Sequence, residues 1–258
     1  MATALITGAT SGIGASFADL LASERFDLIL VARDLARLES KAYELRTKYS
    51  INVDILPADL SQKNQVAVVE ARLRDLAKPV EILVNNAGYG INKSFLVSEG
   101  DAEIALLDVL VTAPLKLMHA VLPGMKVRNH GIIINVSSVA GWIAAGSYSA
   151  AKSYLTVLSE SLHTELQATG VKVHVLCPGF TRTEFHHRGK MRMNLVPAFM
   201  WLDADRVVRE AWQSAQKGEV ISVPGWQYKV LSTFSRFGPR PLVRKVGMKV
   251  RVRQRPRE

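Results

Sequence analysis

The sequence predicts an α/β fold, a single doubly wound domain with helices on both faces of a seven-stranded, mostly parallel sheet. Short apolar runs alternate with helical patterns along most of the 258-residue chain. Several of these runs are apolar almost throughout, as strands are when both faces of a parallel sheet are covered. With 48% hydrophobic residues and no repeat or interior linker, the chain is long enough to bury one substantial core.

The predicted elements follow one another in regular order. Strands are expected at 3–7, 27–32, 53–56, 81–84, 131–136, 171–177 and 219–223. Helical patterns lie near 13–24, 35–49, 61–77, 100–127, 148–169 and 203–217. Asp34, Ser61 and Asp203 stand where an N-cap side chain is useful. The alternation lapses in two places, at 180–202 and after 224.

A glycine-rich loop follows the first predicted strand. The segment "TGATSGIG" holds Gly8, Gly12 and Gly14 and leads into a helix, so its backbone can approach a pyrophosphate. The spacing differs from G-x-G-x-x-G, and a tight turn without a ligand is the alternative. Arg33 follows the second strand where NAD sites usually carry an acid, and an arginine suits a 2′-phosphate. The loop therefore predicts NADP(H), unless Arg33 is merely a solvated residue at a helix entry.

The segment "GSYSAAKS" places Tyr148 and Lys152 four residues apart on a predicted helix. Residues i and i+4 share one helix face, so the ammonium group can lie beside the phenol. The spacing alone is weak, because Tyr89 and Lys93 repeat it in a segment that Gly90 and Asn92 make typical of a loop. The pair needs a cofactor site to act on.

Taken together, these motifs resemble the short-chain dehydrogenase/reductase family from about residue 3 to residue 223. The resemblance rests on "TGATSGIG" (7–14), "ADL" (58–60), "NNAG" (85–88), "INVSS" (134–138), "YSAAK" (148–152) and "PGFTRT" (178–183), in the family's order. It implies a Rossmann-type sheet of order 3-2-1-4-5-6-7 and an NADP(H)-dependent oxidoreductase similar to bacterial ketoacyl reductases. Such an enzyme moves a hydride between nicotinamide and a carbonyl or secondary alcohol.

The resemblance also assigns roles. Tyr148 is expected to be the general acid in reduction and the base in the reverse direction. Lys152 is expected to lower the pKa of Tyr148 and to bond the nicotinamide ribose, while Ser138 orients the substrate oxygen. The expected cofactor contacts are Gly8, Thr10, Ser11, Gly12, Ile13, Gly14, Arg33, Asp59, Asn85, Ala87, Gly88, Tyr148, Lys152, Pro178, Gly179, Thr181 and Thr183.

One position departs from the family pattern. In "DVLVTAP", Leu110 stands where the family often has an asparagine that helps hold a water of the proton relay. Leucine cannot hold a water. Three alternatives follow: the proton travels by another water route, proton delivery is slower, or the chain is a non-enzymatic NADP(H)-sensing protein. The intact Ser138, Tyr148 and Lys152 favour an enzyme.

The segment 180–202 corresponds to the family's substrate lid. Its apolar residues are Phe185, Met191, Met193, Leu195, Phe199, Met200 and Trp201. Ser138, Trp142 and Phe185 are expected to contact the substrate. These side chains predict an apolar carbonyl, such as a 3-oxoacyl thioester, another lipid ketone or a steroid-like ketone. The alternative is that they only pack the lid on the sheet.

The net charge of +10 is concentrated at the end of the chain. Residues 226–258 hold ten lysines and arginines but one acid, Glu258, which divides the chain into a near-neutral catalytic domain (1–225) and a basic extension. Val230, Leu231, Phe234 and Phe237 lie among these cations, a mixture typical of interfacial segments that contact membranes peripherally. A solvated, disordered end is the alternative. Nucleic acid is not expected, because Trp226 and Tyr228 offer little stacking surface.

The remaining signals bear on compartment and assembly. Cys177 lies in an apolar run and predicts a buried, reduced thiol. We expect a cytoplasmic protein, since neither a signal peptide nor an uncharged membrane span is apparent. No metal site is expected, because the adjacent His186 and His187 would point apart on a helix. The resemblance implies a homodimer or homotetramer through 100–127 and 148–169.

Overall fold

The computed structural model describes residues 1–189, 191, 193 and 196–254. Its centre is one seven-stranded sheet in the order β3-β2-β1-β4-β5-β6-β7, with every neighbouring pair parallel. The strands are β1 (Thr3–Thr7), β2 (Asp27–Ala32), β3 (Val53–Pro57), β4 (Ile82–Asn85), β5 (Gly131–Val136), β6 (Val171–Leu176) and β7 (Ile221–Ser222). The predicted fold class and strand order are confirmed.

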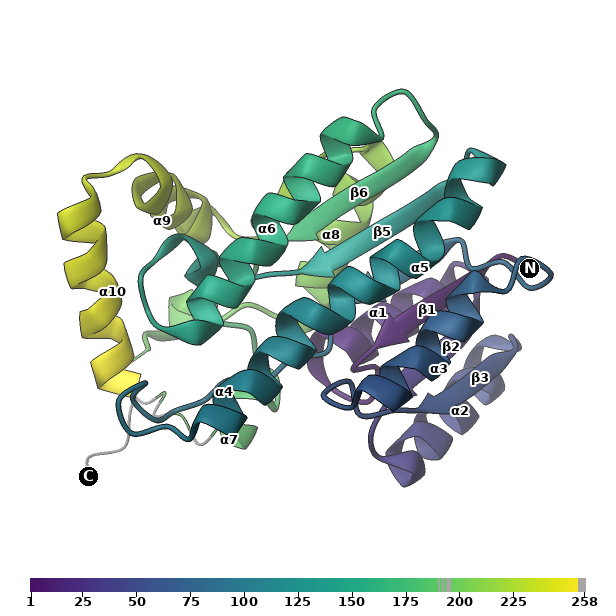
Figure 1. Cartoon of the computed structure of the whole chain (residues 1–258), viewed down its shortest axis with the longest axis horizontal. Helices are drawn as coiled ribbons and strands as arrows, with labels where there is room; N and C mark the ends of the chain where they lie inside the picture. Colours follow the sequence, from purple (N-terminus) through teal and green to yellow (C-terminus); the bar gives the residue numbers. More distant parts are fainter. Residues whose placement is uncertain (190, 192, 194–195, 255–258) are drawn as a thin grey trace.

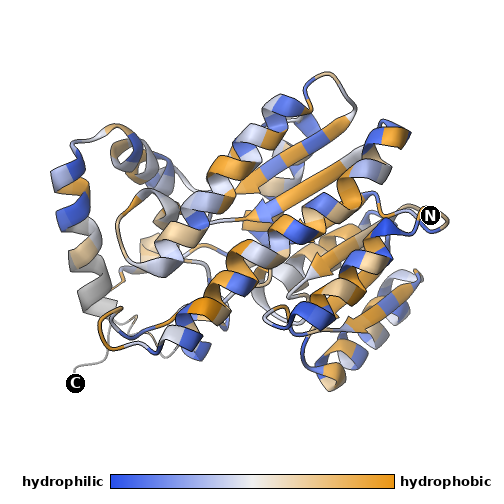
Figure 2. Cartoon of the chain, viewed as in Figure 1, coloured by the Kyte–Doolittle hydropathy of each residue, from blue (hydrophilic) through white to orange (hydrophobic). Residues whose placement is uncertain are grey.

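Helices cover both faces of the sheet (Figure 1). One face carries α1 (Gly12–Ser23), α2 (Leu35–Tyr49) and α8 (Ala204–Lys217), which form one core cluster with the sheet. The other carries α3 (Lys63–Arg74), α5 (Ala113–Arg128) and α6 (Ser147–Glu165), which form a second. Apolar residues dominate the central strands, as expected for a sheet buried on both sides (Figure 2).

Two of the three predicted N-caps are confirmed. Asp34 accepts a hydrogen bond from the backbone N–H of Arg37 at 3.1 Å, and Asp203 accepts one from Arg206 at 3.0 Å. The prediction for Ser61 is wrong, because α3 begins two residues later and its N-cap is Gln62. Ser61 instead donates its hydroxyl to Asp59 at 2.8 Å, which fixes the loop after β3.

The long helix predicted at 100–127 is continuous but irregular. It runs through α4 (Gly100–Leu107), a π-helical segment at Asp108–Thr112 and then α5. Among the described residues, Gly100–Arg128 is long and apolar enough to cross a membrane, but half of its most apolar window is buried inside the protein. Because α5 packs against the sheet and α3, this segment is a core helix.

The end of the chain is helical rather than disordered through residue 254. Helices α9 (Trp226–Phe237) and α10 (Arg240–Gln254) extend beyond the sheet, where no helix was predicted (Figure 1). Gly247 of α10 packs against Ile143 and Ala144, in the segment that follows β5. Short helices occur at Val139–Trp142, Phe185–Arg188 (α7) and Ala198–Met200. Of the apolar residues predicted for the lid, Leu195 lies outside the described residues.

Candidate active site

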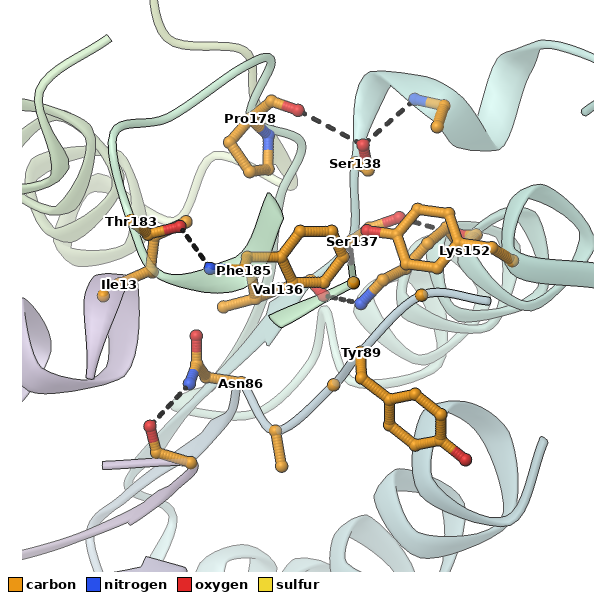
Figure 3. A pocket seen from close by; sticks show the side chains of 18 of the residues that line it. Ile13, Asn86, Tyr89, Val136, Ser137, Ser138, Lys152, Pro178, Thr183 and Phe185 are labelled. Atoms are coloured by element: carbon orange, nitrogen blue, oxygen red, sulfur yellow. Dashed lines mark hydrogen bonds between the residues drawn. The ribbon is translucent and has the colours of Figure 1, made fainter. Parts of the chain in front are cut away.

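The loops at the carboxyl ends of the strands enclose a cavity of about 910 Å³. In an open α/β sheet this is the edge where ligands bind. Most of the predicted site residues line the cavity (Figure 3). These are Gly8, Thr10, Ser11, Gly12, Ile13, Arg33, Asp59, Ala87, Gly88, Ser138, Tyr148, Lys152, Pro178, Gly179, Thr181, Thr183 and Phe185.

The glycine loop needs glycine for two physical reasons. Gly8 and Gly12 have φ of +67° and +54°, in the left-handed region that other residues rarely adopt. A Cβ at Gly12 would also lie 2.9 Å from the Cβ of Thr183. Gly14 lies outside the cavity lining, and a Cβ there would overlap the carbonyl oxygen of Gly8. The loop therefore exposes bare backbone and the start of α1 to the cavity, which fits a pyrophosphate.

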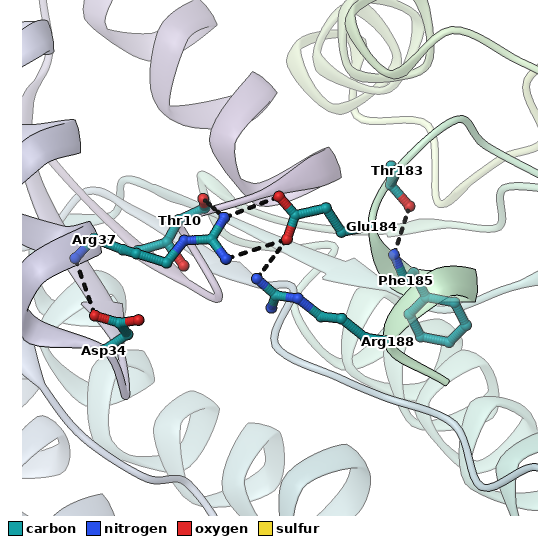
Figure 4. Close-up of polar contacts among 7 residues, drawn as sticks. All are labelled: Thr10, Asp34, Arg37, Thr183, Glu184, Phe185 and Arg188. Atoms are coloured by element: carbon teal, nitrogen blue, oxygen red, sulfur yellow. Dashed lines mark hydrogen bonds and ion pairs between the residues drawn. The ribbon is translucent and has the colours of Figure 1, made fainter. Parts of the chain in front are cut away.

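A pair of arginines lies beside this loop. Arg33 is exposed at the cavity edge, and Arg37, one helical turn later, donates to the carbonyl of Thr10 at 3.1 Å. Arg37 also forms a two-pronged ion pair with Glu184 at 3.0 and 3.2 Å (Figure 4). Glu184 contacts Arg188 as well, and its hydrogen bond to Arg37 lowers the pKa of its carboxyl group. Because Glu184 neutralises Arg37, Arg33 is the better placed ligand for a 2′-phosphate.

Asn85 ends β4 and Asn86 follows it, and the two side chains bond to different partners. The predicted contact Asn85 does not line the cavity; it is buried, and its Nδ2 donates to Asn135 on β5 at 2.9 Å. Asn86 does line the cavity, although it was not predicted, and its Nδ2 donates to the carbonyls of Thr7 and Gly8. The "NNAG" motif thus couples β4 to β5 through one amide and to the glycine loop through the other.

Ser138, Tyr148 and Lys152 converge on one wall of the cavity. Ser138 follows β5, and its Oγ accepts from the N–H of Ala140 at 3.1 Å and donates to the carbonyl of Pro178 at 3.4 Å. Tyr148 and Lys152 lie one turn apart in α6, with the Lys152 Nζ 5.7 Å from the centre of the phenol ring. The same Nζ donates to the carbonyl of Val136 at 2.7 Å. Helix α6 and strand β5 thus position all three side chains.

The expected lowering of the Tyr148 pKa is not what the structure gives. Burial raises the pKa of the phenol above its ordinary value, and the hydrogen bond with Ser138 opposes this only in part. Burial also lowers the pKa of Lys152 to about 8, because the low-dielectric surroundings disfavour the ammonium ion. Tyr148 is therefore protonated at neutral pH, as a proton donor must be.

Leu110 occupies the position where a relay asparagine was expected. It is buried in the π-helical segment and packs with Leu106 and Ala151. A Cβ on Gly88 would lie 2.8 Å from the Leu110 side chain and 3.8 Å from the Lys152 Nζ. The Leu110 side chain and the Lys152 Nζ thus both lie close to Gly88.

The cavity wall away from the glycine loop is mainly apolar. Lid residues Phe185, Met191 and Met200 line it, and the Phe185 ring lies 5.8 Å from the Tyr148 ring. Trp142, an expected substrate contact, does not line the cavity; its ring stacks under the guanidinium group of Arg236 at 5.3 Å. Ile143 and Ala145 line it instead.

The end of the chain contributes a wall that the sequence did not indicate. Tyr228, Leu231, Phe234 and Ser235 of α9 and Val243 of α10 line the same cavity. Tyr228 is buried, and its Oη accepts from the N–H of Phe180 at 2.9 Å and donates to the carbonyl of Met200 at 2.6 Å. One phenol from α9 thus joins the turn after β6 to the far end of the lid.

The described residues contain no group of three His, Cys, Asp or Glu side chains close enough to hold a metal ion. His186 packs against the rings of Phe180, Phe185 and Trp201, and burial lowers its pKa. Cys177 is fully buried and unpaired, and burial raises the pKa of its thiol to about 12.

Comparison with known proteins gives the family. Residues 2–194 match the family model for short chain dehydrogenases, so the chain belongs to this family of oxidoreductases. It is 34% identical over 185 residues to an uncharacterized oxidoreductase of Staphylococcus saprophyticus, covering 70% of this chain and 78% of that protein. It is 32% identical over 182 residues to the ketoacyl reductase HetN of Nostoc, covering 69% of this chain but only 63% of HetN.

Solved structures agree with the fold and the reaction class. A short-chain dehydrogenase from Sphingobium yanoikuyae in complex with NADPH superposes with a TM-score of 0.84 at 33% identity, covering 90% of this chain and 93% of that one. A bulky-bulky ketone specific alcohol dehydrogenase from Comamonas testosteroni gives 0.80 at 32% identity, covering 90% and 91%. The predicted family and enzyme class, an oxidoreductase acting on CH–OH or C=O groups, are confirmed, and the predicted NADP(H) agrees with the first neighbour.

Proposed function

We propose that this protein is an NADP(H)-dependent reductase of bulky, apolar carbonyl compounds. One cavity is lined both by residues suited to a dinucleotide and by residues suited to an apolar substrate, and the proposal rests on this combination. The glycine loop and Arg33 lie on one side, and Ser138, Tyr148 and Lys152 lie beside an apolar chamber. The NADPH complex of the Sphingobium neighbour and the bulky-ketone specificity of the Comamonas enzyme support it.

When bound, NADPH supplies the hydride, and the chain's own residues hold the site. Backbone N–H groups at the start of α1 would bind the pyrophosphate, and Arg33 the 2′-phosphate. Asp59 lines the cavity with its Oδ1 already accepting from the N–H and hydroxyl of Ser61, so its carboxylate is fixed in place for the adenosine end. Lys152 would bond the ribose near the nicotinamide.

Tyr148 donates the proton that a carbonyl oxygen needs as it becomes a hydroxyl. Burial raises the pKa of this phenol, so the proton stays on Tyr148 until the carbonyl oxygen takes it. Ser138 would donate to the same carbonyl oxygen in place of the Pro178 carbonyl, while the N–H of Ala140 holds its Oγ in position. Lys152 then stabilises the charge left on the phenolate.

The apolar chamber sets the substrate class. Phe185, Met191, Met200, Ile143 and Leu231 line it, and such side chains bind hydrocarbon rather than sugar or amino acid groups. A 3-oxoacyl thioester, a lipid ketone or a steroid-like ketone fits this lining. We propose further that 180–202 is the lid, that 1–225 is the catalytic domain, and that 226–258 is an extension completing the chamber.

The function is tested by NADPH oxidation with a panel of ketones of increasing apolar bulk, next to short polar carbonyls. Turnover of bulky ketones with kcat/KM at least about tenfold above that for polar ones is expected, from the burial of several CH₂ groups. Activity confined to polar carbonyls contradicts the substrate class. NADPH binding without turnover of any ketone instead favours the cofactor-sensing alternative, for which Leu110 is the one specific observation.

We also propose a cytoplasmic homodimer formed through α4, α5 and α6. These helices carry apolar residues that are exposed in the single chain. They are Ile104, Leu107, Leu115, Tyr154 and Val157. Light scattering is expected to give a dimer for the wild type and a monomer for Val157→Glu, because a charge on this surface would be buried without a partner. A wild-type monomer contradicts this assembly.

A further inference from the structure

Helix α9 turns its hydroxyl-bearing residues toward the protein and exposes apolar residues on the opposite side. A helix that packs on a core usually has the reverse arrangement. The side turned toward the protein carries Tyr228, Ser232 and Ser235, which are 1%, 5% and 3% exposed. The opposite side carries apolar residues at positions i, i+4, i+8 and i+11, which lie along one face of a helix. They are Trp226, Val230, Phe234 and Phe237, with 72%, 65%, 42% and 80% of their surface exposed. We call these four residues the α9 outer face.

Phe234 lies at the edge of this face and also lines the cavity, whereas Trp226, Val230 and Phe237 do not line it. An exposed apolar side chain is ordinary when it stands alone, but four in one stripe mark a surface that contacts something else. The buried side of α9 is already complete, since the Tyr228 hydroxyl has both of its partners and Ser232 donates to the carbonyl of Lys229 at 3.0 Å. The helix could satisfy its internal contacts without any apolar residue on the outside.

The α9 outer face lies in a strongly cationic region. Exposed lysines and arginines flank it on α9 and on the first turns of α10, and residues 226–254 contain no acid. They are Lys229, Arg236, Arg240, Arg244 and Lys245. Arg236 has Glu160 of α6 at 3.7 Å, whereas the other four form no ion pair among the described residues. The surface therefore combines apolar insertion groups with a surplus of positive charge.

Charge selects among the partners that an apolar stripe can have. In a symmetric dimer built on this face, the same patch meets itself, so the cations of the two copies would oppose one another. Phosphates of a nucleic acid would complement the cations but leave the apolar stripe in water. An anionic bilayer satisfies both, because its headgroups attract the cations while its interface takes up Trp, Phe and Val.

We propose that the α9 outer face docks on the surface of an anionic phospholipid bilayer. The same helix lines the substrate chamber with Leu231 and Phe234, and α10 does so with Val243. Docking would therefore place one wall of the chamber against the lipid. That consequence for substrate entry rests on the proposed function, whereas docking itself does not.

The test uses the full chain and co-sedimentation with vesicles of phosphatidylglycerol and phosphatidylcholine in equal parts, next to pure phosphatidylcholine. The wild type is expected to sediment with the mixed vesicles and to stay in the supernatant with pure phosphatidylcholine vesicles. Val230→Ser/Phe237→Ser and, separately, Arg240→Gln/Arg244→Gln/Lys245→Gln are each expected to reduce binding about tenfold or more. Val127→Ser, at a valine of α5 that is 85% exposed against 65% for Val230, is the control and leaves binding unchanged.

NADPH binding and Trp226 emission distinguish loss of the bilayer contact from unfolding of the variant and from failure of the proposed function. None of the substituted residues lines the cavity. NADPH binding by each variant is therefore expected to equal that of the wild type. Trp226 emission is expected to shift to shorter wavelength with mixed vesicles, and Trp226→Phe to remove that shift. Absence of wild-type binding, or binding by both multiple variants at the wild-type level, overturns the proposal. A wild-type dimer that Val230→Ser/Phe237→Ser converts to monomer, without vesicle binding, assigns the face to a second copy instead.

Discussion

The substitution Tyr228→Phe tests how α9 holds the active site. Tyr228 contributes an oxygen that accepts from the N–H of Phe180 and donates to the carbonyl of Met200, while its ring covers Gly179. Phenylalanine keeps the ring and removes both hydrogen bonds. Each partner left without a bond costs ~1–3 kcal/mol when buried. Because both partner residues are partly exposed, water can relieve part of this, and we expect a loss of about 2–4 kcal/mol.

The assay is equilibrium urea unfolding followed by intrinsic fluorescence, with KM for a ketone measured in parallel. KM is expected to rise more than kcat falls, because Tyr228 bonds to Phe180 and Met200, which line the cavity, and not to Ser138, Tyr148 or Lys152. Tyr43→Phe is the control, since Tyr43 is exposed on α2, and it should change stability by less than about 0.5 kcal/mol. A Tyr228→Phe protein as stable as this control would show that the two hydrogen bonds do not stabilise the fold.

Three further predictions follow from the site. Arg33→Ala should weaken NADPH binding about 10- to 100-fold and NADH binding little, from the loss of charge-assisted bonds to the 2′-phosphate; equal losses in a fluorescence titration would contradict this. In a pH series, kcat/KM for reduction should fall above pH about 8, where Lys152 loses its proton, and a profile flat to the ordinary lysine range would count against it. Between pH about 8 and the unfolded lysine value of ~10.4, the unfolded chain holds the extra proton, so this group adds stability as pH rises. Leu110→Asn should cost about 2–3 kcal/mol in urea unfolding because it buries an amide among Leu106 and Ala151, and a stability equal to wild type would show that the amide finds partners there.

The sheet and its ligand-binding edge were predictable because their signals are local. Apolar runs, glycines with positive φ at positions 8 and 12, and aspartates at two helix starts each act within a few residues. Ser61 failed as a cap because α3 begins at Lys63 with Gln62 as its N-cap, while the Ser61 hydroxyl donates to Asp59. A capping preference alone does not show which local hydrogen bond wins.

The residues that the sequence missed or misplaced depend on contacts between distant segments. Asn85 and Asn86 carry the same side chain, and only the register of β4 beside β5 turns one toward Asn135 and the other toward the glycine loop. The Trp142 ring lies outside the chamber, where it stacks on the guanidinium group of Arg236. These two residues are 94 positions apart, so no local pattern could indicate their contact. Arg37 was findable, since it follows Arg33 by one helical turn.

The end of the chain shows a different limit. The spacing of Trp226, Val230, Phe234 and Phe237 is helical, but a helical apolar stripe is usually interpreted as a core-facing side. Here the core side is Tyr228, Ser232 and Ser235, small or hydrogen-bonded groups that give a weak hydropathy signal. Periodicity therefore predicts that a helix has two different sides, and the tertiary structure decides which of them is buried.

In the proposed reaction Tyr148, supported by Ser138 and Lys152, donates a proton to an apolar ketone during NADPH oxidation. Single-turnover reduction of a bulky ketone by Tyr148→Phe, beside Tyr154→Phe on the same helix, tests it most directly. We predict that Tyr148→Phe slows reduction by ~10²- to 10⁴-fold, with far smaller changes in NADPH affinity, while Tyr154→Phe behaves as wild type. Reduction by Tyr148→Phe at the wild-type rate would contradict the account.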